Sequence, residues 1–593
     1  MREEVIGSMD EVRPEPQTET QSQARSDSLP SAAGLGVVAA LALPLAACGG
    51  GGGGGGGGSS PPPPPPPPVL NYTETEAARF LLQAQFSLTT EDITAVRQQT
   101  YSTWLDNQFA AAPSQTGTAW LDGQTHGTPK ADGNYFNPSM GDWMAWRMMM
   151  TGSDQVRKRL ALALSEMLVT SLSPIDGFWP PYVIAGYWDM LTANVFGNFR
   201  TLIEEVTLNP SMGFFLNTKG NQKEDPSTGR VPDENYAREI MQLFTIGLYE
   251  LNLDGTVKTN SAGQPIETYV QSDITNLARV FTGYDWNYSR VTWQNTVFLP
   301  YAIPTTEFTR DRMALDASKH SDLAVTFLGT TIPANTPGAT ALQTALNTLF
   351  NHPNVGPFFA RQMIQRLVTS NPSPAYIQRV ATAFNNNGAG VRGDLKAVWK
   401  AILTDVEART LPTSPRAGKL REPIVRWAQW ARTFNVTSAT GKWEIYDTSN
   451  ADTGLGQSPL RSPSVFNFFR PGYVPPQTQF ATDGDVAPEF QIHNETSTAG
   501  YINFLAWSMA NGYNDVKPSY SNVLSLVTDS KGLLDWLNLR FTANQISPAT
   551  ITLMQAALDA NPVTAASTDA QKMDRIHGAL LMVMACPEYI VQK

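Results

Sequence analysis

Apolar residues recur at helical spacing along most of the chain from residue 71 onward. A capping box, Thr73-x-x-Glu76, precedes the apolar run from Ala77 to Leu82, and Gly or Pro marks the ends of later runs. The pattern predicts helices over residues 156–170, 234–246, 274–281, 355–368 and 424–434. The first of these segments is apolar almost all round, which is typical of a buried helix.

Strand-like alternation is scarce and limited to short stretches such as residues 291–298. Residues 284–340 and 436–500 lack helical periodicity and are rich in Pro, Gly, Asn and aromatic residues. Loops of that length in a compact domain are often functional. We therefore predict a mainly α protein, with one large multi-helical domain or two helical lobes, long ordered loops and few short strands.

The first seventy residues have a different character. The apolar run from Ala32 to Ala47 is shorter than the roughly 20 residues that span a bilayer, and it fits the apolar core of a signal peptide. It ends in Leu45-Ala46-Ala47-Cys48, which resembles the lipobox at which bacterial lipoproteins are lipidated and cleaved. The alternative is a loose Ala/Leu segment with an unrelated cysteine.

A glycine tract from Gly49 to Gly58 and a proline tract from Pro61 to Pro68 follow that cysteine. Polyglycine is flexible and polyproline is extended, so the two tracts form a tether that would hold a folded body away from a surface. We predict a lipoprotein-type signal peptide over residues 1–47, lipidation at Cys48, a Gly/Pro-rich tether over residues 48–70 and a helical domain over residues 71–593.

Composition narrows the range of functions. The net charge is −11, which argues against nucleic acid as a partner because phosphate binding needs a basic face. The charged share of 16%, with 45 Gly and 43 Pro, suits an exported protein with long loops. The five histidines do not lie at metal-ligand spacing and no Cys-x-x-Cys pair occurs, so we predict no metal and no cofactor.

The predicted helix over residues 234–246 carries one polar face. Its members are Asn235, Arg238, Glu239 and Gln242, at three- and four-residue spacing. Such a face could bind a polar ligand, with Glu239 as a general acid or base. The interpretation we favour is a buried ion network that holds helices in register, with Arg279 or Arg421 as partner.

Two further residues are candidates for chemistry. Glu166 lies in an apolar segment, where an unpaired carboxyl would have a raised pKa and could act as a general acid, although pairing with Arg157, Arg159 or a distant arginine is the favoured interpretation. His320 lies in a predicted loop and is the first choice of catalytic histidine if the protein is an enzyme. The aromatic residues around Trp179 and Trp286 suit either sugar stacking or loop packing.

Several blocks of sequence resemble a known family. They include Asn235-Tyr236-Ala237-Arg238-Glu239, Ala278-Arg279-Val280-Phe281-Thr282-Gly283 and Lys419-Leu420-Arg421-Glu422-Pro423. Together they resemble the bacterial family of domain of unknown function 1800, in the same order and over residues 71–593. The resemblance implies export and a sulfatase-like exported partner, but no activity. Another branch has a Trp-His-x-His-Phe cluster where this chain has Leu164 to Leu168, so no metal role carries over.

We therefore predict an exported, lipid-anchored protein of the cell envelope, placed at the outer membrane or cell surface if the host has an outer membrane. Its expected function is binding or assembly with an exported, sulfatase-like partner, and its expected contact with the membrane is through the lipid. The alternative is a hydrolase or lyase that acts on an envelope or extracellular polymer and uses Glu239, Glu166 or His320. Asn235, Arg238, Gln242 and Arg279 are the candidate ligand-binding residues.

Overall fold

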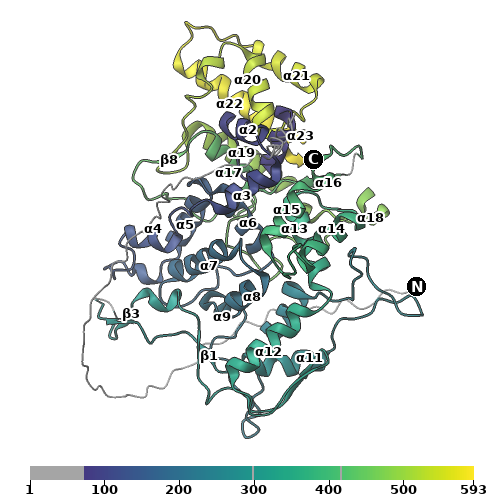
Figure 1. Cartoon of the computed structure of the whole chain (residues 1–593). Coiled ribbons are helices and arrows are strands. Elements are labelled where there is room, and N and C mark those ends of the chain that lie inside the picture. Colours follow the sequence, from purple (N-terminus) through teal and green to yellow (C-terminus); the bar gives the residue numbers. More distant parts are fainter. Residues whose placement is uncertain (1–71, 297–298, 415–416) are drawn as a thin grey trace, which may run out of the picture. The chain divides into compact units, whose positions relative to one another are not determined.

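Helices dominate the computed structural model, which describes residues 72–296, 299–414 and 417–593 (Figure 1). These residues belong to one unit of the chain. The predicted signal peptide and tether lie outside the described residues. None of the described helices is both long and apolar enough to cross a membrane.

The described residues form 23 α-helices. In chain order they are α1 (Glu74–Ala84), α2 (Thr90–Arg97), α3 (Tyr101–Ala110), α4 (Gly117–Gly123), α5 (Ser139–Met150), α6 (Gln155–Ser165), α7 (Pro180–Asn194), α8 (Phe199–Thr207), α9 (Pro210–Phe215), α10 (Asn235–Glu239), α11 (Gln271–Ala278), α12 (Gly338–Asn351), α13 (Val355–Leu367), α14 (Pro374–Asn385), α15 (Leu395–Thr404), α16 (Val406–Arg409), α17 (Pro423–Thr433), α18 (Gln479–Asp483), α19 (Glu495–Asn511), α20 (Ser530–Leu537), α21 (Pro548–Asp559), α22 (Asp569–Ala585) and α23 (Pro587–Ile590). Short 3-10 helices are η1 (Asn134–Phe136), η3 (Arg279–Phe281), η4 (Thr306–Thr309), η5 (Pro488–Ile492) and η6 (Leu524–Leu526), and π-helical turns are η2 (Ile240–Thr245) and η7 (Asn538–Thr542).

Strands are few and short, as the sequence predicted. They pair antiparallel in two-stranded sheets: β1 (Tyr284–Asp285) with β4 (Ala314–Leu315), β2 (Trp293–Gln294) with β3 (Ile303–Pro304), β5 (Val325–Phe327) with β6 (Thr330–Ile332), β7 (Lys419–Leu420) with β10 (Val591–Gln592), and β8 (Thr437–Ser438) with β9 (Val516–Lys517). The mainly α fold class is confirmed.

Helix starts follow the capping signals of the sequence. The side chain of Thr73 accepts from the Glu76 amide and Glu76 accepts from the Thr73 amide, so the capping box of α1 is complete. Pro423 occupies the first turn of α17, where its missing N–H costs nothing.

Two predicted helices differ from their patterns. Helix α6 ends at Ser165 rather than at residue 170. The sequence pattern ran past the end of the helix because the turn that follows is also buried and apolar. The segment predicted as one helix over residues 234–246 is α10 followed by the π-helical turn η2. Six residues are too few for sequence periodicity to distinguish the two helix types.

Large aromatic side chains and arginine caps hold the core together. Trp146 of α5 meets Trp427 of α17 edge to face, with ring centroids 4.6 Å apart, and both indoles are buried. From the same helix α17, Arg432 donates to the carbonyl oxygens of Met149, Thr151 and Gly152, which close the end of α5.

Helix α1 and the last described residues lie side by side (Figure 1). Arg79 of α1 donates through Nε to the main-chain oxygen of Lys593 at 3.0 Å, and Asn544 donates to the Thr75 hydroxyl at 2.8 Å. Next to Lys593, β10 pairs with β7, so the segment that begins at Lys419 is tied to the last described strand.

Residues 248–268 form a small protruding segment that we call the β-arm. Isolated antiparallel β-bridges hold it together, between Tyr249 and Glu267, Leu251 and Val257, and Thr259 and Pro265. Asn354 anchors this arm to the entrance of α13. Its amide donates to the carbonyl oxygens of Ile246 at 2.9 Å and Tyr249 at 2.8 Å, and its Oδ1 accepts from the Leu251 amide at 2.9 Å.

We predict that Asn354→Ala loosens the arm. The substitution leaves buried main-chain groups without partners, at a cost on the order of 2–3 kcal/mol. Melting temperature should fall, and amide hydrogen exchange should accelerate over residues 248–268 in particular. The matched control is Asn511→Ala, which removes one exposed bond to the Trp507 carbonyl and should change little. Unchanged exchange in the arm of Asn354→Ala would contradict this anchoring role.

Candidate functional site

A cluster of charged side chains lies deep in the core, where the segment Lys419–Glu422 meets α6 and α13. We call Glu166, Arg366, Lys419, Glu422 and Glu489 the buried ion cluster, and each of the five is at most 6% exposed. Lys419 Nζ lies 3.0 Å from Glu489 and 3.4 Å from Glu422. Arg366 Nε lies 3.7 Å from Glu166 and its Nη2 donates to the Glu166 carbonyl at 2.8 Å.

Polar neighbours complete the cluster. Gln457 donates to Glu422 at 2.9 Å, and Lys419 donates to the main-chain oxygen of Arg366 at 2.8 Å. Arg159 donates to the same Arg366 oxygen at 2.9 Å. Charges buried to this extent are retained only when partners surround them, and the partners here come from several distant stretches of the chain.

Glu166 and Glu422 act on each other electrostatically, and their pKa values shift in opposite directions. Burial, and then the negative charge of Glu422, raise the pKa of Glu166 well above its ordinary value. Burial also acts to raise the pKa of Glu422, but the charges of Lys419 and Arg159 and the hydrogen bond from Gln457 lower it to about 2. These directions favour the neutral acid at Glu166 and the carboxylate at Glu422.

The polar face of the helix over residues 234–246 lies near the surface. Arg238 pairs with Glu234 at 3.3 Å, and its side chain is 40% exposed. The Tyr269 hydroxyl donates to Gln242 Oε1 at 3.0 Å, and the main-chain N–H of Asn235 donates to the Asp233 carboxylate. The buried ion network that the sequence favoured for this helix is therefore wrong.

Neither arginine expected to join that helix does so. Arg279 lies 3.8 Å from Glu224, and Arg421 donates to Gln429 and to the Phe541 carbonyl in another part of the core. The expectation failed because residues spaced three and four apart on a helix establish a shared face but not which neighbour covers it.

Glu239 differs from its neighbours on α10. Its side chain is 7% exposed, and its Oε2 is buried with no hydrogen-bond partner among the described residues. Burial raises the pKa of this carboxyl, and the nearby Arg238 charge only partly opposes the shift. A carboxyl with a raised pKa beside a π-helical turn is a reasonable candidate for acid–base chemistry.

Arg279 and His320 lie in one neighbourhood, around Glu224 and Thr282. The Ser321 hydroxyl donates to Glu224 at 2.9 Å, and Arg279 lies against the same carboxylate. His320 is buried, and its Nδ1 donates to the Thr282 carbonyl at 2.9 Å. His320 thus lies in a loop, as predicted, but its side chain is buried because the loop folds inward against the end of η3.

The structure thus brings together Arg279 and His320, and it places Asn235, Arg238, Glu239 and Gln242 along α10 and η2. Glu166 is separate from both groups, in the buried ion cluster. The aromatic residues considered for sugar stacking are also internal: Trp179 and Trp286 are buried, and their indole N–H groups donate to the carbonyl oxygens of Pro304 and Pro210.

Sequence reasoning missed Arg366, Glu422 and Glu489 as functional or structural partners. One signal was available, because Lys419-Leu420-Arg421-Glu422-Pro423 places three charged residues in five positions directly before an apolar helix. Lys419, Arg421 and Glu422, the three charged residues of this block, are all buried.

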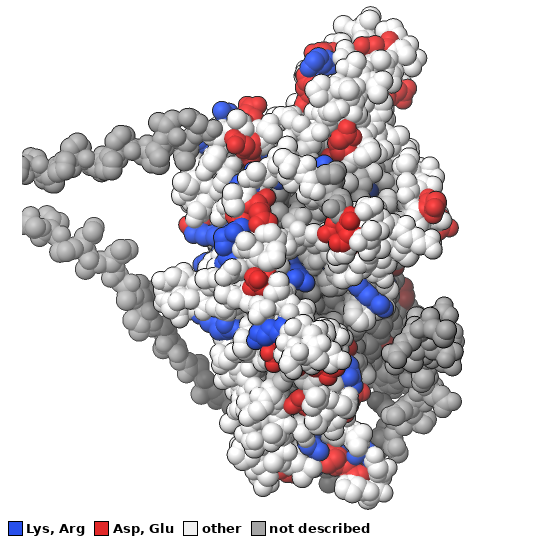
Figure 2. Space-filling view, turned by 90° about the vertical axis from the view of Figure 1, so that its right-hand side faces the viewer, with Lys and Arg blue, Asp and Glu red and all other residues white. Residues whose placement is uncertain are grey.

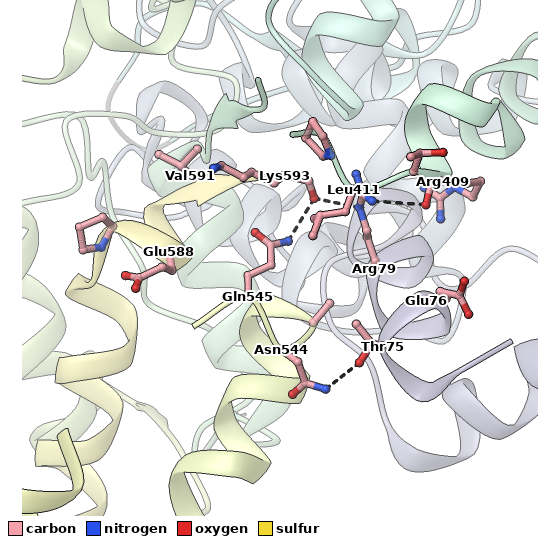
Figure 3. Close-up of a pocket in the computed structure, with 14 residues that line it drawn as sticks. Thr75, Glu76, Arg79, Arg409, Leu411, Asn544, Gln545, Glu588, Val591 and Lys593 are labelled. Carbon is pink, nitrogen blue, oxygen red and sulfur yellow. Dashed lines mark hydrogen bonds between the residues drawn. The ribbon is translucent and has the colours of Figure 1, made fainter. Parts of the chain in front are cut away.

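The cavity in Figure 3 lies between α1, α16 and the last described residues, and has a volume of about 760 Å³. Arg79 and Arg409 line it, and Arg79 holds the main-chain oxygens of Lys593 and Arg409. None of the sequence-predicted site residues lines this cavity. Among the described residues, no group of three or more His, Cys, Asp or Glu side chains is arranged to hold a metal ion.

On the face shown in Figure 2, acidic and basic side chains are interspersed among uncharged residues.

Comparison with known proteins gives one match. A family model described as protein of unknown function (DUF1800) matches residues 79–591. No curated protein and no solved structure matches the chain.

We predict unequal effects of substitution at Glu166 and Glu422. Glu166→Gln replaces a carboxyl that burial drives toward its neutral form by a near-isosteric neutral amide, and it should change the unfolding free energy by less than about 1 kcal/mol at pH 7. Glu422→Gln removes the carboxylate that Lys419 faces and should cost on the order of 3–5 kcal/mol. Denaturant unfolding of the two variants beside wild type measures the difference.

The same assignment gives a pH dependence. The folded-state pKa of Glu422 is depressed, so its contribution is present above the unfolded value near 4.5 and is lost as pH falls toward about 2. The raised pKa of Glu166 favours folding below about 4.5, and that contribution is lost progressively as pH rises from there through the raised value. Equal destabilisation by the two substitutions at pH 7 would contradict the assignment.

Proposed function

The chain belongs to the DUF1800 family, and from that premise we propose that it is an exported, lipid-anchored protein that binds a partner protein at the cell envelope. The partner that the family resemblance implies is an exported, sulfatase-like protein. The observation that carries the proposal is that two of the acid–base candidates, Glu166 and His320, are buried and make their contacts inside the protein. Glu166 is enclosed with Glu422 and Arg366, and His320 is bonded to the Thr282 carbonyl.

The anchor half of the proposal rests on the sequence before the described domain. Leu45-Ala46-Ala47-Cys48 supplies small residues for a peptidase groove and a thiol nucleophile for the diacylglycerol. The glycine and proline tracts that follow would separate the helical domain from the membrane. A tether of this kind suits a protein that meets its partner at some distance from the bilayer.

A hydrolase or lyase acting on an envelope or extracellular polymer is the second candidate function, and one observation favours it. Glu239 is a buried carboxyl whose Oε2 has no partner among the described residues, and burial raises its pKa. A carboxyl that acts as a general acid near neutral pH needs its pKa shifted in this direction. Arg238 and Gln242 flank it on the same helical segment and would contact the substrate.

The anchor can be tested at one residue. Cys48→Ala should move the protein from the membrane fraction to the soluble fraction or leave it unprocessed, because the thiol is the only lipid acceptor in the proposal. Cys586→Ala is the matched control: that cysteine is buried in the helical domain, and its loss should leave localisation unchanged. Wild-type protein that carries no lipid would refute the anchor.

Partner binding and catalysis are separated by a second experiment. The full chain is cross-linked in cells and purified. We expect an exported protein to co-purify with it in an amount comparable to that of the chain itself. Purification of that exported protein should in turn recover this chain. Under the rival function, no partner is found and envelope polymer is degraded. Glu239→Gln should then abolish degradation without lowering the melting temperature, whereas the exposed Glu267→Gln should remain active.

A further inference from the structure

The cavity of Figure 3 contains a buried arginine that pairs with no carboxylate side chain among the described residues. We call it the arginine cavity. Arg79 lines it from α1 and is 8% exposed. Its Nε donates to the main-chain oxygen of Lys593 at 3.0 Å and its Nη1 to that of Arg409 at 3.3 Å, so the guanidinium lies between these two oxygens (Figure 3). A side-chain charge buried to this extent is unfavourable unless an opposite charge lies beside it.

The third nitrogen of this guanidinium is available to a ligand. Nη2 of Arg79 donates no hydrogen bond to another described residue. Unlike Nε of the neighbouring Arg409, it is not one of the unpartnered nitrogens that the fold seals off from solvent. Because Arg79 lines a cavity of about 760 Å³, an acceptor inside that cavity can reach Nη2.

The two glutamates that line the same cavity do not neutralise Arg79. Glu76 accepts from the main-chain N–H and the hydroxyl of Thr73 at 2.8 and 2.9 Å, and Glu588 accepts from the Thr550 hydroxyl at 2.8 Å. Both carboxylates point away from Arg79 in Figure 3. Their charges would repel a doubly charged anion more strongly than a singly charged one, so a monoanion is the better match.

A second arginine adds positive charge next to the first. Arg409 donates to the Gln83 side-chain oxygen and lies over the rings of Phe80 and Tyr101, 5.1 and 5.4 Å from their centroids. None of these groups is a carboxylate. Burial, with a further contribution from the Arg79 charge, lowers the pKa of Arg409 to about 10, so it is still protonated at neutral pH. This end of the cavity therefore favours negative charge.

Another part of the cavity wall is apolar. Leu411, Pro412, Ala543 and Val591 contribute to it. Ligand sites commonly combine such a wall with a few polar groups that fix the orientation of the ligand. A ligand that fits both parts carries a hydrocarbon body as well as an acidic group.

We propose that the arginine cavity binds a small organic acid, with its single carboxylate on Arg79 Nη2 and its hydrocarbon part against the apolar wall. A hydrogen bond between two charged groups is stronger than one between neutral groups, so the carboxylate is preferred over an amide of the same shape. An inorganic anion would leave the wall uncovered. This ligand site goes beyond the proposed function and does not depend on it.

The test measures binding of 4-phenylbutyrate to the full chain by isothermal titration calorimetry. The protein is in nonionic detergent at pH 7 and constant ionic strength, and the detergent buffer alone gives the blank. 4-Phenylbutyramide, which has the same body without the charge, should bind more weakly by about tenfold or more. Arg79→Gln should remove this preference for the acid over the amide.

A second variant leaves Arg79 and its hydrogen bonds intact. Leu411→Asp adds a negative charge to the cavity wall and should weaken binding of 4-phenylbutyrate by about tenfold or more. Leu411 is 57% exposed, so the melting temperature should stay unchanged, and it is measured alongside. The control is Leu553→Asp, which adds the same charge at a 73% exposed position on α21 and should keep wild-type affinity.

Three results would overturn the assignment of this cavity: no binding of 4-phenylbutyrate, equal affinity for the acid and the amide, or wild-type affinity in Leu411→Asp. Tighter binding of the dianion 4-phenylbutyl phosphate would also contradict a site for a single carboxylate. The proposed function is tested by Cys48→Ala and by partner capture, so either proposal can fail while the other stands.

Discussion

Burial of charge along the segment Lys419–Glu422 is the constraint on which the rest of the fold depends. Lys419 lies between Glu422 and Glu489, while Glu166 and Arg366 come from the C-terminal ends of α6 and α13. Taking so many ionisable groups out of water is costly, and it is tolerated only if all partners are in place. The cluster therefore joins segments that lie between residues 166 and 489 into one cooperative core.

This constraint also shapes the functional conclusion. Glu166, which has the raised pKa expected of a general acid, is buried beside Arg366 and Glu422. Perturbed pKa values occur in structural networks as well as in active sites, and the geometry around the group distinguishes the two. The apolar residues of the β-arm, by contrast, are exposed on the surface.

Local physics was predictable from the sequence, and tertiary pairing was not. The capping box at Thr73 and the proline at the start of α17 identified two helix starts because those signals act within one turn. The partner of Glu166 could not be found this way, since Arg366 lies two hundred residues along the chain. His320 and Trp286 were placed in loops, but nothing local to those residues shows that the loops fold inward. The π-helical turn after Glu239 escaped prediction because its hydrophobic spacing resembles that of an α-helix.

The protonation of Glu166 at neutral pH is the central claim, and infrared difference spectroscopy tests it directly. The spectrum of Glu166→Gln is subtracted from that of wild type at pH 7, with uniformly ¹³C-labelled protein to confirm the carboxyl assignment. The account predicts that the substitution removes the band of a protonated carboxylic acid and leaves the carboxylate bands unchanged. Loss of a carboxylate band instead would mean that Glu166 is ionised in the buried ion cluster and would contradict the account.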